Sequence, residues 1–140
     1  MTLWVHSRSD YRSMKSLLIV TGAIEAATGL ALFGLPSLAV SLLLGGSLEA
    51  PAALVLARVT GAALFALGVA CLLARNDSKS GAAAGVVTAM LLYNVAAASV
   101  LVYASVGVGL SGIGLWPAFL LHAALAIWCI ACLRSQRDSH

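Results

Sequence analysis

Residues 16–35 read SLLIVTGAIEAATGLALFGL, a run of 20 residues in which Glu25 is the only charged side chain. A helix of this length rises about 30 Å, which matches the hydrocarbon thickness of a bilayer. The whole chain has the same character, because 61% of its 140 residues are hydrophobic and only 9% are charged, whereas about 25% of a typical soluble domain is charged. We therefore expect an integral membrane protein whose first partner is the lipid bilayer.

Three further segments have a spanning length, and proline marks several of the boundaries. The predicted spans are 16–35, 51–74, 81–106 and 116–133. Proline breaks a helix interior but is tolerated in the first turn, so Pro36 ends the first span while Pro51 and Pro117 begin the second and fourth. Ser80 is the expected N-cap of the third span. The predicted fold class is all-α, with residues 1–140 forming a single transmembrane domain, a four-helix bundle.

A short apolar segment separates the first two spans. Residues 37–44 are too few to cross a bilayer, and they are too apolar for a solvated loop. We expect a short helix that lies in the membrane interface and ends at Gly45 and Gly46.

All but one of the lysines and arginines gather in the two terminal segments and in the loop between the second and third spans. They are Arg8, Arg12, Lys15, Arg75, Lys79, Arg134 and Arg137. The other two loops contain no lysine or arginine. Because lysine and arginine accumulate in cytoplasmic loops, both termini are predicted to be cytoplasmic. Bases divided among short segments form no continuous basic face, so no nucleic-acid partner is expected.

Each predicted span contributes one strongly polar residue to the middle of the membrane: Glu25, Arg58, Asn94 and His122. Counting along the helices places Arg58 about five residues outward of the midpoint of its span, roughly 7 Å, and the other three near mid-depth. A charge at the bilayer centre costs about 2.5–3.5 kcal/mol on insertion scales. We therefore expect Glu25 and Arg58 to face the bundle interior and form an ion pair, with Asn94 and His122 completing the hydrogen bonds.

Glycines accompany these polar positions. Gly22 and Gly29 share a face with Glu25, and Gly61 and Gly68 lie within reach of the face of Arg58. Glycine lets helix backbones approach closely within a membrane. The sequence GAAAG at 81–85 matches the same small-residue pattern, which supports close helix contact without establishing a dimer.

The order of elements in the first half of the chain resembles a known grouping. A helix ending in GLP at 34–36 is followed by a short apolar segment with GG and then by ARVTGAALFALGVACLLAR at 57–75. This order, over residues 21–75, resembles the small bacterial four-helix proteins grouped as DoxX-like. The resemblance implies a four-helix architecture in the bacterial cytoplasmic (inner) membrane, and it carries no catalytic residues to this chain.

Three kinds of function are compatible with the sequence. The preferred one is a non-enzymatic protein whose polar cluster either clamps the bundle or meets a lipophilic small molecule, alone or as an accessory subunit of a homo-oligomer or larger membrane complex. The second is a proton-coupled small-molecule transporter using Glu25, although a pair with Arg58 would keep that carboxylate ionised. The third is a membrane redox enzyme using Cys129 and Cys132, or His122.

No metal or cofactor is expected. With Cys71 at a similar depth, the C-x-x-C at 129–132 offers three thiols but lacks a fourth ligand for a tetrahedral metal site, and haem ligation by His122 would require a second histidine within the spans. The chain also has no phosphate-binding loop, nucleophile elbow or paired carboxylates. Hydrolase chemistry is therefore not predicted.

Overall fold

The computed structural model describes residues 2–77 and 80–138, with side chains for 12–77 and 80–137. Within these ranges the chain is helical and contains no strand. Five helices are present: α1 (Thr2–Gly34), α2 (Pro36–Leu44), α3 (Pro51–Ala74), α4 (Gly81–Val102) and α5 (Leu115–Asp138). All but α2 are long and apolar enough to cross a membrane. The prediction of an all-helical chain with four spanning-length helices is thus confirmed.

The helix ends follow the local chemistry expected of them. Pro36 and Pro51 occupy the first turns of α2 and α3, and α2 ends at Gly45, whose positive φ of 74° favours glycine. Ser80 caps α4 by accepting a 3.1 Å hydrogen bond from the backbone N–H of Ala83. A short 3₁₀ turn, Arg75–Asp77, follows α3, and a π-helical turn, Tyr103–Gly107, follows α4.

Two helices extend beyond the predicted spans, α1 at its start and α5 at its end. Hydropathy marks only the part of a helix that suits lipid, whereas the hydrogen-bonded backbone continues into the polar flank. Two of the bases in the predicted charge pattern, Lys79 and the side chain of Arg8, lie outside the described residues.

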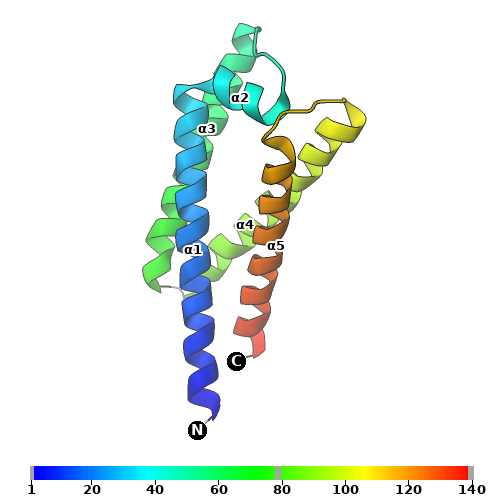
Figure 1. The fold of residues 1–140 in the computed structure, drawn as a ribbon. Helices are drawn as coiled ribbons and strands as arrows, with labels where there is room; N and C mark the ends of the chain where they lie inside the picture. Colours follow the sequence, from blue (N-terminus) through cyan, green and yellow to red (C-terminus); the bar gives the residue numbers. More distant parts are fainter. Residues whose placement is uncertain (1, 78–79, 139–140) are drawn as a thin grey trace.

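Helices α1 and α3 form an antiparallel pair whose backbones touch (Figure 1). A Cβ atom added to Gly29 would lie 2.4 Å from the backbone nitrogen of Phe65, and one added to Gly68 would lie 2.6 Å from that of Ala26. A Cβ atom added to Gly61 would lie 2.6 Å from the backbone nitrogen of Phe33, and one added to Gly22 would lie 2.8 Å from Cγ of Leu72 and 2.9 Å from the carbonyl oxygen of Gly68. We call these four residues, Gly22, Gly29, Gly61 and Gly68, the glycine seam; they bring the two helices together as the sequence predicts.

The GAAAG sequence does not serve the same purpose within this chain. A Cβ atom added to Gly81 or Gly85 would have no heavy atom within 4 Å, apart from its immediate helical surroundings. The expected close contact at this sequence is therefore absent from the described part of the fold. Helix α4 pairs instead with α5 through other residues (Figure 1).

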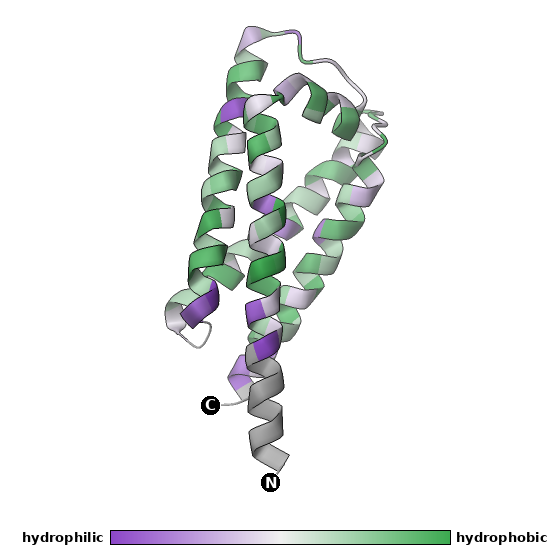
Figure 2. Cartoon of the chain, turned by 60° about the vertical axis from the view of Figure 1, so that its left-hand side comes forward, coloured by the Kyte–Doolittle hydropathy of each residue, from purple (hydrophilic) through white to green (hydrophobic). Residues whose placement is uncertain are grey.

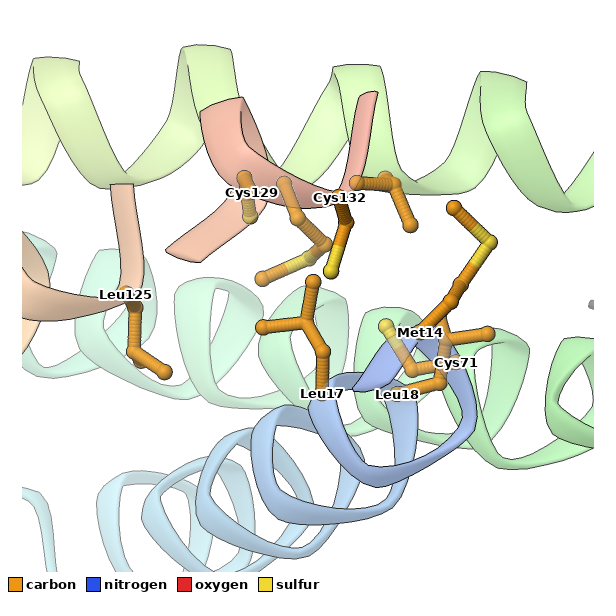
Figure 3. Packing of buried hydrophobic residues seen from close by; sticks show 9 residues of the cluster. Met14, Leu17, Leu18, Cys71, Leu125, Cys129 and Cys132 are labelled. Atoms are coloured by element: carbon orange, nitrogen blue, oxygen red, sulfur yellow. The ribbon is translucent and has the colours of Figure 1, made fainter. Parts of the chain in front are cut away.

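The two helix pairs, α1–α3 and α4–α5, meet at the end of the bundle that carries both termini. A core of buried apolar and sulfur-containing side chains fills this end (Figure 3). Its members are Met14, Leu17, Leu18, Cys71, Val87, Met90, Leu125, Cys129 and Cys132. Trp128 of α5 also donates a 3.1 Å hydrogen bond from Nε1 to the Ser13 hydroxyl of α1. This end of the bundle is therefore closed by continuous packing.

Helix α2 lies across the opposite end, where the two pairs stand further apart (Figure 1). The backbone N–H of Gly114 donates a 2.9 Å hydrogen bond to the carbonyl of Leu42 in α2. A Cβ atom on Gly112 would lie 2.3 Å from the Leu43 carbonyl group, so only glycine permits this approach. A second buried cluster of Leu101, Ala104 and Leu115 packs beside this contact. Helix α2 thus joins the two pairs at the end where they separate.

The polar side chains are distributed unevenly between the two ends of the bundle. Figure 2 shows the spanning helices coloured as hydrophobic along most of their length, with hydrophilic residues towards the end that carries the termini and a few isolated ones near mid-helix. Many large apolar side chains, including Leu56, Leu92 and Ile127, are exposed on the outside of the bundle. An apolar exterior of this extent suits a lipid surrounding.

Candidate functional site

A cavity of about 560 Å³ lies between the two helix pairs and beneath α2. All five helices contribute to its wall, which is mostly apolar. Its lining residues are Ile24, Glu25, Thr28, Ala31, Leu32, Ala39, Val40, Leu42, Leu43, Thr60, Leu64, Tyr93, Ala97, Val100, Leu101, Gly114, Ala118, Leu121 and His122. Among the polar lining residues, Glu25, Tyr93 and His122 lie furthest from α2 along their helices, and we call these three residues the polar floor.

Glu25 occupies the centre of the polar floor and is almost completely buried, with 1% of its surface exposed. The Tyr93 hydroxyl of α4 donates a hydrogen bond to its carboxyl group. The other carboxyl oxygen, Oε1, has no hydrogen-bond partner in the described part of the chain. Buried polar atoms are nearly always paired in folded proteins, so an unpaired, fully buried carboxyl oxygen on a cavity-lining residue is an exception that packing alone does not explain.

Asn94 and His122 form the second half of the polar arrangement. Asn94 is fully buried, and its Nδ2 donates a 2.8 Å hydrogen bond to the Met90 carbonyl one turn earlier in α4. Its Oδ1 therefore faces Nδ1 of His122 in α5, at 2.8 Å. Because an amide oxygen can only accept, Nδ1 of His122 carries the proton, and Nε2 is the acceptor of the neutral ring. Asn94 thus sets the tautomer of a cavity-lining histidine.

The two halves meet through adjacent residues of α4. Tyr93 and Asn94 are separated by about 100° around the helix, so one reaches α1 and the other reaches α5. The rings of Tyr93 and His122 also pack edge to face, with centroids 5.5 Å apart. Three of the four predicted polar residues, Glu25, Asn94 and His122, therefore belong to one cluster, with Tyr93 joining Glu25 to the others.

The predicted ion pair between Glu25 and Arg58 is not formed. Arg58 is exposed, and no salt bridge joins it to Glu25, although both residues are described. The glycine seam gives the reason, since Gly68 lies opposite Gly22 and Ala26 and hence at the level of Glu25. Arg58 precedes Gly68 by ten residues in α3, which is about 15 Å at the helical rise. A count from the midpoint of each span underestimates this separation because it ignores the register of the pair.

Four polar residues in or near the site were missed by the sequence analysis: Thr28 and Thr60, which line the cavity, and Tyr93 and Thr21. Tyr93 lies beside Asn94 in an apolar span, and a hydroxyl there needs a hydrogen-bond partner. Its position in the sequence could therefore have marked it as a member of the polar cluster. Thr21 is one turn before Glu25 on the same face of α1, is 1% exposed, and has no partner for Oγ1 among the described residues. Threonine is common in membrane helices, so a threonine at position 21 gave no comparable signal.

The three cysteines lie in the packed core and away from the polar floor. Cys71 and Cys129 are fully buried, Cys132 is 5% exposed, and none of the three forms a disulfide. Figure 3 shows them among the leucine and methionine side chains of the terminal end. Within the described residues, no group of three histidine, cysteine or acidic side chains is arranged to hold a metal ion. The three cysteines contribute to the packing of this core, because cysteine is a small, readily buried residue.

Comparison with protein-family models, curated proteins and solved structures finds no match for this chain. The likeness to the DoxX-like grouping thus rests on the glycine and apolar spacing of residues 21–75 alone. Functional inference has to start from the cavity and its polar floor.

Proposed function

We propose that this chain is a multi-pass protein of the bacterial cytoplasmic membrane that binds a lipophilic small molecule between its helices without chemical change. The cavity is the observation that carries the proposal. Small-molecule sites are typically apolar clefts of about 300–1,000 Å³ with a few placed polar groups. This cavity has a volume of about 560 Å³, apolar walls and a polar floor at one end.

The arrangement of the floor supports binding over a purely structural clamp. A clamp between Glu25 and Arg58 would leave both charges paired and the interior filled, whereas Glu25 keeps an unpaired oxygen next to open volume. The bond from Asn94 to His122 fixes the orientation of a lining group, which favours recognition of a defined head group. A homo-oligomer or larger membrane complex is a compatible setting for such a site.

Filling the cavity from its wall tests the proposal. Ala97 lines the cavity on α4, whereas its neighbour Ala96 is exposed and does not line it. We expect Ala97→Leu to weaken binding of a neutral probe, 2-(1-naphthyl)ethanol, at least about tenfold, because added methyl groups occupy the ligand volume and overpacking is costly. Binding is measured by equilibrium dialysis of protein in lipid nanodiscs against empty nanodiscs.

The matched variant Ala96→Leu adds the same side chain to the outside of the same helix. Its affinity for the probe should equal that of the wild type. Equal losses in both variants, or no protein-dependent binding in the wild type, would show that the cavity is not a binding site.

Proton-coupled transport is a second candidate, and one observation favours it. Because Glu25 has no basic partner among the described residues, the objection that Arg58 holds it ionised no longer applies. Transport differs from binding in one requirement, since the bound molecule has to leave on the other side of the membrane. The core that fills the terminal end of the bundle would then have to open.

A further inference from the structure

The charge of the cavity wall is one-sided. Glu25 is the only aspartate, glutamate, lysine or arginine among the lining residues. Arg58, the one base within the predicted spans, is exposed and about 15 Å away along the helix pair. Attraction between opposite charges grows as the surroundings become less polar, so an apolar cavity amplifies the preference set by this single carboxylate. A cation in the cavity would supply the opposite charge that favours the ionised form of this carboxyl group, whereas an anion would not, so the wall discriminates by charge and favours a cation.

The hydrogen-bonding groups of the polar floor have the same bias. Oε1 of Glu25 and Nε2 of His122 are acceptors without partners in the described part of the chain. The one hydroxyl donor of the floor, that of Tyr93, is already bonded to Glu25. Of the two threonine hydroxyls in the wall, that of Thr60 donates to the Leu56 carbonyl of its own helix, and that of Thr28, about one turn nearer α2 than Glu25, can donate or accept. A complementary head group consequently donates hydrogen bonds.

The shape of the cavity defines the rest of the molecule. From Glu25 to Leu32 the wall follows α1 for seven residues, and from His122 to Gly114 it follows α5 for eight, so it runs about 10–12 Å between the polar floor and α2. Towards α2 the lining is aliphatic, with Leu32, Leu42 and Leu43. Polar groups at one end and aliphatic side chains at the other suit an amphiphile with its head on the floor.

We propose that the cavity selects lipophilic amines: molecules with a protonated amine head that lies at Glu25 and His122, and an apolar body that extends towards α2. An ammonium group combines positive charge with several N–H donors, whereas a hydroxyl has a single neutral donor and a carboxylate is repelled. The attraction to Glu25 acts over several ångströms in an apolar wall, so the head need not touch the buried Oε1. This inference rests on the proposed binding function and specifies its ligand class.

Three probes with one naphthalene skeleton test the selectivity: 2-(1-naphthyl)ethylamine, 2-(1-naphthyl)ethanol and 1-naphthylacetate. Each is dialysed against nanodiscs containing wild-type protein or Glu25→Gln, with empty nanodiscs subtracted. We expect the wild type to bind the amine at least about tenfold more tightly than the alcohol, because only the amine carries a charge that Glu25 attracts, and to bind the acid least. Glu25→Gln is nearly isosteric, keeps an acceptor for Tyr93 and removes only the charge, so it should lower the affinity for the amine much more than that for the alcohol and lose the preference for the amine.

The outcomes separate this inference from the function on which it rests. If amine and alcohol bind equally, and Ala97→Leu abolishes both, the cavity binds lipophilic molecules and the amine selectivity is wrong. If no probe binds in a way that Ala97→Leu changes, the binding function itself is wrong. A preference for the amine that survives in Glu25→Gln, with the variant folded by circular dichroism, would assign the selectivity to another group and overturn the inference. The variant Arg58→Ala is the control for a distant charge and should leave all three affinities unchanged.

Discussion

Burying the carboxyl group of Glu25 in an apolar helix costs free energy, and its surroundings limit this cost. Its carboxyl group receives one hydrogen bond from Tyr93 and lies beside open volume, while the base expected to neutralise it points away. Ionisable residues within spans usually serve substrate, ion or proton movement. Whether this residue holds a ligand or also moves protons is a question about a single side chain.

A transport assay on Glu25 answers that question. We expect no uptake of 2-(1-naphthyl)ethylamine into proteoliposomes under an imposed pH gradient beyond that of protein-free liposomes, because the packed core closes the terminal end of the bundle. Wild type and Glu25→Gln should then behave alike, although their affinities differ. Uptake that requires the wild-type carboxylate would instead establish proton-coupled transport and replace simple binding as the function.

The few polar residues of the predicted spans indicated three members of this polar cluster from the sequence alone. Glu25, Asn94 and His122 stand out because a polar side chain in lipid needs a partner, and depth along a helix follows from its length. The partner of Arg58 could not be found in the same way. Its depth relative to Glu25 depends on the register of α1 against α3, and its direction depends on how α3 is rotated, and both are set by packing between helices.

At the scale of elements, the glycine seam sets that register. Four glycines hold α1 and α3 at backbone contact, which leaves Glu25 facing the α4–α5 pair and the cavity. The sequence identified these glycines because small residues on one face favour close helix contact. The GAAAG segment satisfied the same rule without making such a contact, since spacing alone does not determine which face of a helix meets a neighbour.

Adding one methyl group to the seam should separate the pair. We expect Gly68→Ala to lower the free energy of unfolding by about 1–3 kcal/mol, because its Cβ atom would lie 2.6 Å from the Ala26 backbone nitrogen and neither backbone can yield locally. Gly85→Ala is the matched control in α4, where a Cβ meets nothing within 4 Å and alanine is the better helix former. Reversible unfolding in mixed detergent micelles measures both, and a neutral Gly68→Ala would contradict the role of the seam.

At the scale of the whole molecule, the bundle is divided into a packed half and an open half. The core with Met14, Cys71 and Cys129 fills the end that carries the termini, and the cavity lies towards α2. The sequence predicted the number of spanning-length helices, because hydrophobic length alone determines it. It could not predict the cavity, which exists because α2 joins two helix pairs that separate at one end, a result of contacts between distant segments such as Gly112 and Leu43.

The orientation of this asymmetric bundle in the membrane decides from which side the cavity is reached. The described lysines and arginines of the charge pattern lie at the end of the bundle that carries the termini, in α1, in α5 and in the turn after α3. They are Arg12, Lys15, Arg75, Arg134 and Arg137. This end should therefore be cytoplasmic, and the cavity should lie in the outer half of the bilayer. We expect Ser47→Cys and Ser111→Cys to react with a membrane-impermeant maleimide on intact spheroplasts, and Asn76→Cys to react only after permeabilisation. The wild type is the control, because its cysteines are buried and should stay unlabelled. Labelling of Asn76→Cys from outside with protection of Ser47→Cys would invert the protein, and labelling of all three would mean that both orientations occur.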